Sequence, residues 1–208
     1  MVRSMADPAF RASQWTRRFD PHVAPINHYV DEIRNLGYGW APYVAPIHGG
    51  VDARVLSILR DPGPATQDIE NGSGFLCVEN DDASAQLQCE LLDHAGLVAA
   101  DLLPWNAYPW YINRKPSAAE LSLGAPTILR LLELAPAVEV VVLQGADAQA
   151  AWRLLRRHHA KALRSRRLTV VETYHPSRQA LFTPDPAEQD RRRARRFEAF
   201  SEIAAALT

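Results

Sequence analysis

Four short apolar segments alternate with segments of helical periodicity along this chain of 208 residues, and this alternation constrains the fold more than any other feature. The apolar segments are ARVLSIL (53–59), VAADLL (98–103), AVEVVVLQG (137–145) and RLTVVET (167–173). Each is short and mostly apolar, as is typical of a strand buried in a parallel sheet. Because strands that alternate with helices form parallel sheets, we predict an α/β fold. It is a single-domain, three-layer α/β/α arrangement with a central four-stranded, mainly parallel sheet.

Helices are predicted over residues 21–37, 81–97, 117–135, 146–160 and 186–207. The second of these has an aspartate to cap its first turn and Gly96 near its end. The third begins with Ser117 and Glu120, which have the spacing of a capping box. Pro126 lies inside this third helix and is a candidate break or kink.

The domain organisation follows from the position and the length of the apolar runs. Residues 1–20 are predicted to form a loose N-terminal arm, and residues 21–208 the α/β domain. No apolar run reaches the roughly 20 residues of a membrane helix. The N-terminus also lacks the apolar stretch of a signal peptide. We therefore expect a cytoplasmic, monomeric protein that does not engage membranes.

The chain has two cysteines, Cys77 and Cys89. Two thiols are too few for a four-thiolate zinc or iron–sulfur site, and no His-rich spacing suits zinc. We expect both to be reduced and structural, and we expect the protein to use no metal and no other cofactor.

The net charge of −1 excludes a uniformly basic nucleic-acid binder, but the charge is distributed unevenly. Arginine is concentrated in RRHHAKALRSRR (156–167) and RRRARRF (191–197). Each run is simply explained as a solvated helix face, and together they are also consistent with a surface that faces phosphates.

Three of the predicted strands end in unusual polar residues. Asp61 lies in RDPGPATQ (60–67), Asn106 in LLPWNAYPW (102–110) and His175 in TYHPSRQ (173–179). Ligands of open α/β sheets bind outside the carboxyl ends of the strands, which share one edge in a parallel sheet. The sequence therefore predicts that these three side chains meet in one pocket.

Each of these residues can also be explained by a purely structural role. The sequence Asp-Pro-Gly strongly favours a turn, and Asn106 can hydrogen-bond its own loop. His175 can be a partly buried imidazole whose nitrogens are hydrogen-bonded within the protein. Three such residues at three strand ends are harder to explain in this way. Aromatic residues also lie nearby: Phe75 in GSGFLCV (72–78), and Trp105, Tyr108, Trp110 and Tyr111 around Asn106. They suit either a stacked heterocycle or ordinary core packing.

Four motifs, RDPGPATQ, GFLC, LLPWN and YHPS, resemble in order and spacing those of the uracil-DNA glycosylase superfamily. The resemblance covers roughly residues 50–205. The DPGP form is similar to the single-strand-selective branch, which has Asn-Pro-Gly-Pro. WNAYPWYINRKP looks more like the thermostable iron–sulfur branch, although the cysteines that hold its cluster are absent here.

The resemblance implies a catalytic role for two residues. Asp61 would orient or activate the water that attacks the sugar C1′. His175 would donate a hydrogen bond to uracil O2 as negative charge develops there, which is electrostatic catalysis by a positioned donor.

The resemblance also implies binding roles. Phe75 would stack on the flipped base, and Asn106 would read the uracil edge. Pro62 and Gly63 would belong to the base pocket. Ser177, with Arg178 and Gln179 beside it, would hold the DNA backbone.

The chain departs from the family pattern at three positions. Arg60 stands where a small or amide residue is usual, and Gly63 where the best-known branch has a tyrosine that blocks the thymine methyl group. Gln179 replaces a common leucine wedge, for which Leu181 or Phe182 are substitutes.

Three functions remain open at this point. The first is a monofunctional DNA glycosylase that hydrolyses the N-glycosidic bond of uracil or a related deaminated base after base flipping. The second is a glycosylase-like protein that binds DNA or a modified base without cleaving it, which Arg60 beside Asp61 favours. The third is a hydrolase of free nucleosides, which suits the arginine clusters less well because these fit a long polyanion.

Overall fold

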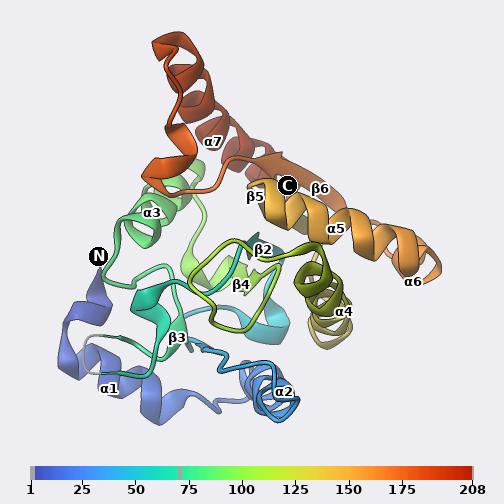
Figure 1. The fold of residues 1–208 in the computed structure, drawn as a ribbon. Coiled ribbons are helices and arrows are strands. Elements are labelled where there is room, and N and C mark those ends of the chain that lie inside the picture. The colour runs from blue at the N-terminus through green and yellow to red at the C-terminus, as the bar shows by residue number, and fades with distance from the viewer. Residues whose placement is uncertain (1–2, 70–71, 208) are drawn as a thin grey trace.

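The computed structural model describes residues 3–69 and 72–207 (Figure 1). Its central sheet consists of β2 (Val55–Leu59), β4 (Leu102–Asn106), β5 (Val140–Gln144) and β6 (Thr169–Thr173). The strand order is β4-β2-β5-β6, and every pair is parallel. The prediction of a four-stranded parallel sheet is thereby confirmed. Residues 1 and 2 of the predicted arm, and residues 70, 71 and 208, lie outside the described residues.

Helices cover both faces of the sheet, which confirms the three-layer α/β/α fold (Figure 1). One face packs against α2 (Ala24–Arg34), α4 (Ala118–Leu134) and α5 (Ala146–His158). The other face packs against α3 (Ala83–Ala95) and α7 (Pro186–Ala206). Adjacent strand residues supply the two cores in alternation, as Leu56 and Val55 do on β2. None of the described helices combines the length and apolar character that a bilayer span requires.

The predicted helix signals act as expected at α3 and α4. The Asp82 carboxylate accepts hydrogen bonds from two N–H groups of the first turn of α3, and Gly96 ends that helix in the left-handed conformation. Ser117 and Glu120 form the reciprocal capping box of α4. Pro126 does not end this helix, since α4 continues to Leu134 with one side buried against the sheet.

Strand β4 starts later than the sequence predicts. Residues 98–103 were expected to be the strand, but Ala99–Asp101 form the short 3₁₀ helix η4 and the strand continues through Pro104 to Asn106. The Ala107 N–H donates to the Leu59 carbonyl oxygen at 2.8 Å, so alternate residues of this strand face β2 and the nitrogen of Pro104 faces the free edge. An edge strand tolerates proline because no ladder hydrogen bond is lost there.

The N-terminal segment is not a loose arm, and that prediction is wrong for the described residues. Ser4–Ala6 form the 3₁₀ helix η1 and Pro8–Arg17 form α1. The Trp15 Nε1–H donates to the Ser73 carbonyl oxygen at 3.0 Å. The Trp15 ring lies 4.9 Å from the ring of Phe75. These contacts hold α1 against a small parallel pair, β1 (Tyr43–Val44) and β3 (Phe75–Leu76), which the sequence did not predict.

Gly74 is required at the contact between α1 and the strand β3. Its φ is +80°, and a Cβ atom there would lie 2.3 Å from the indole of Trp15. Any larger residue would separate the helix from the strand. The packing of Trp15 therefore requires the second glycine of the GSGF sequence.

We predict that Trp15→Ala lowers the free energy of unfolding by about 2–4 kcal/mol, since it removes a packed aromatic ring and a hydrogen bond. Urea denaturation of the full chain measures this change. Ser13→Ala, an exposed change on the same helix, should leave stability within about 0.5 kcal/mol. Equal stability of the Trp15 variant and the wild type would show that the arm is loose in solution after all.

Candidate active site

A cavity of about 540 Å³ opens at the carboxyl edge of the sheet. Its lining includes residues from all three loops that the sequence singles out: Asp61, Pro62, Gly63, Asn106 and His175. Parallel pairing explains this convergence, because β2, β4 and β6 all end at the same edge. The structure therefore brings together the three strand-end residues that were expected to meet.

Asp61 follows β2, and its side chain is almost fully buried. The Nε–H of Arg60 donates to one carboxylate oxygen, Oδ1. The other oxygen, Oδ2, has no hydrogen-bond partner among the described residues. Burial raises the pKa of Asp61, while the hydrogen bond and the charge of Arg60 act in the opposite direction. Arg60 thus favours the ionised carboxylate in a site that would otherwise disfavour it.

Asn106 is the last residue of β4 and pairs in register with Leu59, two residues before Asp61. Its exposed fraction is 3%, and its amide oxygen has no partner among the described residues. A buried polar atom without a partner is costly, so such atoms in a cavity indicate a place for ligand groups. The amide offers both a donor and an acceptor to such a ligand.

His175 lies two residues after the end of β6 and is held in one protonation state. The backbone N–H of Ser177 donates to its Nδ1 at 3.1 Å, so Nδ1 is an acceptor. Burial lowers the pKa of His175 to about 4, and the positive charges of Arg60 and Arg196 act in the same direction. The imidazole is therefore neutral at pH 7, with its proton on Nε2. This leaves an Nε2–H donor on a ring that lines the cavity.

A buried arginine fixes the backbone around His175. Arg196 of α7 is buried, and its Nη2 donates to the carbonyl oxygens of His175 and Ser177, the latter at 2.8 Å. Burial lowers the pKa of Arg196 to about 10, but the group stays charged at pH 7. In the sequence, Arg196 lies within the arginine run 191–197, and nothing in that run predicts this contact.

Gly145, which links β5 to α5, allows His175 to pack closely. Its φ is +102°, and a Cβ atom there would lie 3.1 Å from the Cβ of His175. Its N–H also donates to the Thr173 carbonyl oxygen at 2.8 Å. A side chain at this position would displace the loop that carries the histidine.

Further polar side chains, which the sequence does not predict, belong to the site. Asn80 lines the cavity, donates to the Phe75 carbonyl oxygen at 2.9 Å, and has an amide oxygen without a partner among the described residues. Gln88 of α3 also lines it and accepts a hydrogen bond from Gln144 at 3.1 Å. The only sequence signal for Asn80 is its place just after the GFLC motif.

Phe75 does not line the cavity, which corrects its expected stacking role. It is 0% exposed and packs against Trp15 and Tyr43. Neighbouring residues of a strand point to opposite sides, so Leu76 is the residue of β3 that faces the cavity. Among the aromatic residues near Asn106, Trp105 also lines the cavity, whereas Tyr108 and Trp110 belong to the core.

The residues expected to hold DNA lie beside the cavity and do not line it. Ser177 precedes the short helix η5 (Arg178–Leu181), on which Arg178 and Gln179 are exposed. Phe182, just after this helix, is 72% exposed. This loop therefore presents an arginine and a large aromatic side chain to solvent close to His175.

The two arginine runs have different surroundings. On α7, Arg191, Arg192, Arg193 and Arg195 form ion pairs with neighbouring carboxylates. The run 156–167 extends from the second half of α5 to just before β6, so it lies at the amino edge of the sheet, opposite the cavity. It does not adjoin the candidate site.

The described part of the chain contains no group of three or more His, Cys, Asp and Glu side chains arranged to hold a metal ion. Cys77 and Cys89 are free, buried thiols, and burial raises the pKa of both. The expectation that the protein needs no metal stays a prediction.

Comparison with known proteins adds one finding. No curated protein sequence matches the chain. The profile of the Uracil DNA glycosylase superfamily matches residues 46–207, a segment that contains β2, β4, β5, β6 and all of the residues that line the cavity. Since this match spans well over half of the chain and includes each of the strand-end motifs, the chain belongs to the uracil-DNA glycosylase superfamily.

Proposed function

We propose that the protein is a monofunctional DNA glycosylase that excises uracil or a related deaminated base. In this reaction the base leaves the DNA stack and enters the cavity. The bond between the sugar C1′ and the base nitrogen breaks, and the oxygen of a water molecule bonds to C1′. The base leaves with the bonding electron pair and takes up a proton, and the water loses one. The abasic strand remains intact.

One observation carries this proposal. The cavity gathers a neutral imidazole donor, a buried carboxylate and two amides with unpartnered oxygens, all fixed at strand ends or just after β3. A pyrimidine edge that offers both N–H and C=O groups is complementary to such a mixed set. The cavity volume of about 540 Å³ is also in the range of small-ligand sites.

His175 is proposed to stabilise the departing base. Its Nε2–H would donate to the oxygen on which negative charge develops. The hydrogen bonds from Arg196 to the backbone of His175 and Ser177 would hold the loop in place during the reaction. A neutral imidazole suits this role because its Nε2–H stays protonated near pH 7 and can donate a hydrogen bond without transferring the proton.

Asp61 is proposed to stabilise the sugar cation and to position the attacking water through its unpartnered Oδ2. Asn106 and Asn80 are proposed to read the base edge, and Pro62 and Gly63 to border the base. A Cβ atom at Gly63 would meet no atom within 4 Å, so this side of the cavity is open. Ser177, Arg178 and Gln179 are proposed to hold the DNA backbone.

A second function is favoured by the ion pair of Arg60 with Asp61. The guanidinium occupies one oxygen of the carboxylate that would help the sugar cation. If it holds Asp61 away from the sugar, the protein binds a damaged base in DNA without cleaving the glycosidic bond.

We also propose that the protein is monomeric and works in the cytoplasm. The support is chemical: Cys77 and Cys89 are free thiols, which persist in a reducing compartment.

We predict that the protein converts a single-uracil oligonucleotide into an alkali-labile abasic product, and that His175→Ala lowers the single-turnover rate by about 10²–10³. DNA affinity and melting temperature should stay close to those of the wild type. His158→Ala, an exposed histidine on α5, is the matched control and should keep the full rate. Binding without strand breaks in the wild type would support the second function, and a full rate in His175→Ala would remove this histidine from the mechanism.

We predict that Asn106→Asp lowers uracil excision by about 10–100-fold, because a carboxylate offers only acceptors to the base edge and loses the amide donor. Competition between uracil and cytosine oligonucleotides measures the change in base choice. Asn35→Asp, the same change at an exposed position, should have no effect on either. If the Asn106 variant excised uracil at the wild-type rate, Asn106 would not read the base.

We predict that Arg60→Gln moves the acidic limb of the pH–rate profile to higher pH. Arg60 lowers the pKa of both Asp61 and His175, so its removal raises both. Activity that needs an ionised Asp61 and a neutral His175 is then lost earlier as the pH falls. Single-turnover rates between about pH 4 and pH 8 test this. An unchanged limb would contradict the proposed protonation states, and cleavage by the variant alone would identify Arg60 as the group that blocks the wild type.

A further inference from the structure

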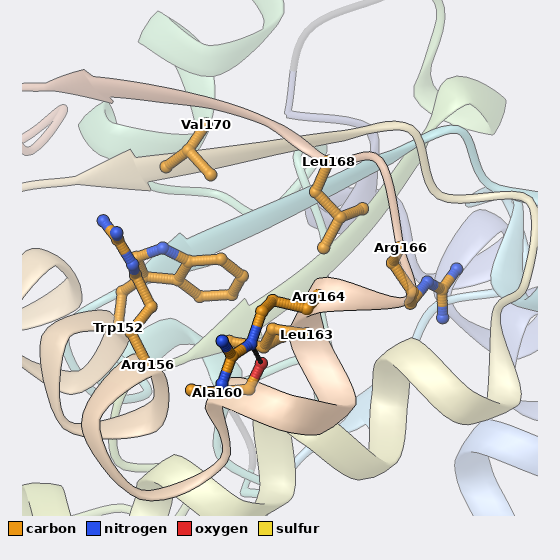
Figure 2. A pocket seen from close by; sticks show the side chains of 8 residues that line it. All are labelled: Trp152, Arg156, Ala160, Leu163, Arg164, Arg166, Leu168 and Val170. Carbon is orange, nitrogen blue, oxygen red and sulfur yellow. Dashed lines mark hydrogen bonds between the residues drawn. The ribbon is translucent and has the colours of Figure 1, made fainter.

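A second cavity, of about 580 Å³, lies at the edge of the sheet opposite the candidate active site. Figure 2 shows the residues that line it. It is bordered by the second half of α5, by α6 (Ala160–Arg164) and by the start of β6. Because Thr169 pairs with Val140 at the start of β5, this end of β6 is at the amino edge of the sheet. The two cavities share no lining residue.

The floor of this cavity is apolar, as Figure 2 shows for Trp152, Leu163, Leu168 and Val170. Val170 is 39% exposed although it belongs to a strand of the central sheet. Trp152 is only 4% exposed, and its indole N–H has no hydrogen-bond partner among the described residues. A buried indole usually finds an acceptor, so this one indicates an acceptor on a ligand.

The rim of the cavity is strongly basic. Residues 153–167 contain six arginines, one lysine and no aspartate or glutamate. The guanidinium of Arg166 donates hydrogen bonds to backbone carbonyl oxygens at and just after the end of α4, including that of Pro136 at 2.9 Å. Arg156 and Arg164 form no ion pair with any carboxylate of residues 3–69 and 72–207. This contrasts with the paired arginines of α7.

Strand β6 adds a feature that suits a polypeptide. It is the edge strand of the sheet, and the Thr169 N–H donates to the Glu139 carbonyl oxygen at 2.9 Å. Alternation along a parallel strand then turns the backbone N–H and C=O of Val170 away from β5. An exposed edge of this kind is a template for pairing with another chain.

We propose that this cavity docks an acidic peptide segment of a partner protein. A large apolar side chain of that segment would fill the floor over Trp152, and its carboxylates would lie near Arg156 and Arg164. Charge complementarity favours an acidic ligand, and the apolar floor favours a peptide over a nucleic acid, whose phosphates need no such floor. The indole N–H of Trp152 supplies one directional contact inside the cavity.

The test uses the full-length protein and a short fluorescent peptide with a central phenylalanine flanked by glutamates. We expect binding with a dissociation constant of about 10–100 µM. Replacing the phenylalanine of the peptide with alanine should weaken it about tenfold, since the apolar anchor is lost. Trp152→Phe, which keeps an aromatic ring and removes the N–H, should weaken it a few-fold.

A matched pair of double variants separates the cavity from general charge attraction. Arg156→Glu with Arg164→Glu should weaken the peptide about tenfold or more, because these residues line the cavity. Arg153→Glu with Arg157→Glu makes the same charge change on exposed positions of α5 outside the cavity and should weaken it less than about threefold.

Three results would overturn the proposal. The first is an equal loss in both double variants, which would indicate only long-range charge attraction. The second is displacement of the peptide by a single-stranded oligonucleotide of equal charge at the same concentration, which would make this surface a nucleic-acid site. The third is the absence of peptide binding at about 1 mM.

Discussion

The parallel pairing of β2 with its two neighbours is the constraint on which the rest of the molecule depends. Because β2 lies between β4 and β5, its register sets where each neighbouring strand ends. The pair Leu59 and Asn106 brings the end of β4 within two residues of Asp61. β6 then joins the far side of β5 in the same direction and delivers His175 to the same edge. A shift of one residue in any of these pairs would turn alternate side chains to the other face and disperse the site.

The sequence could predict this convergence because its causes are local. Strand character is visible in short apolar runs, and polar residues directly after such runs must lie at the carboxyl edge. The role of Phe75 could not be predicted in the same way. Whether Phe75 or Leu76 faces the cavity depends on Trp15, which arrives from α1 and packs on one side of a two-residue strand. A strand this short has no alternation that sequence alone can read.

The errors at the N-terminus and at β4 have a common physical origin. α1 has few apolar residues, and its position rests on tertiary contacts such as that of Trp15 with Ser73. A short helix that packs through a few side chains, here Phe10 and Trp15, leaves little periodic signal. For β4, the predicted strand stops at residue 103, just before Pro104, yet an edge position removes the cost of the missing N–H of this proline. Both outcomes depend on which neighbours a segment has, and sequence periodicity does not report neighbours.

The burial of Arg196 could have been predicted from its helical spacing, although the neighbouring arginines suggested an exposed position. Arg196 lies on α7 at helical spacing from Ala199, Phe200 and Ile203, all of which are buried, so its position on the apolar stripe was readable. Because the surrounding arginines form ion pairs on the surface, the buried position of Arg196 does not stand out from the run. Burying a guanidinium without a carboxylate is costly, and here hydrogen bonds to two backbone carbonyl oxygens offset part of that cost. A carboxylate in their place would pair with the charge but would also raise the pKa of the neighbouring imidazole. Carbonyl partners instead leave the positive charge of Arg196 uncompensated, so this charge adds to the burial and to the charge of Arg60 that together keep His175 neutral.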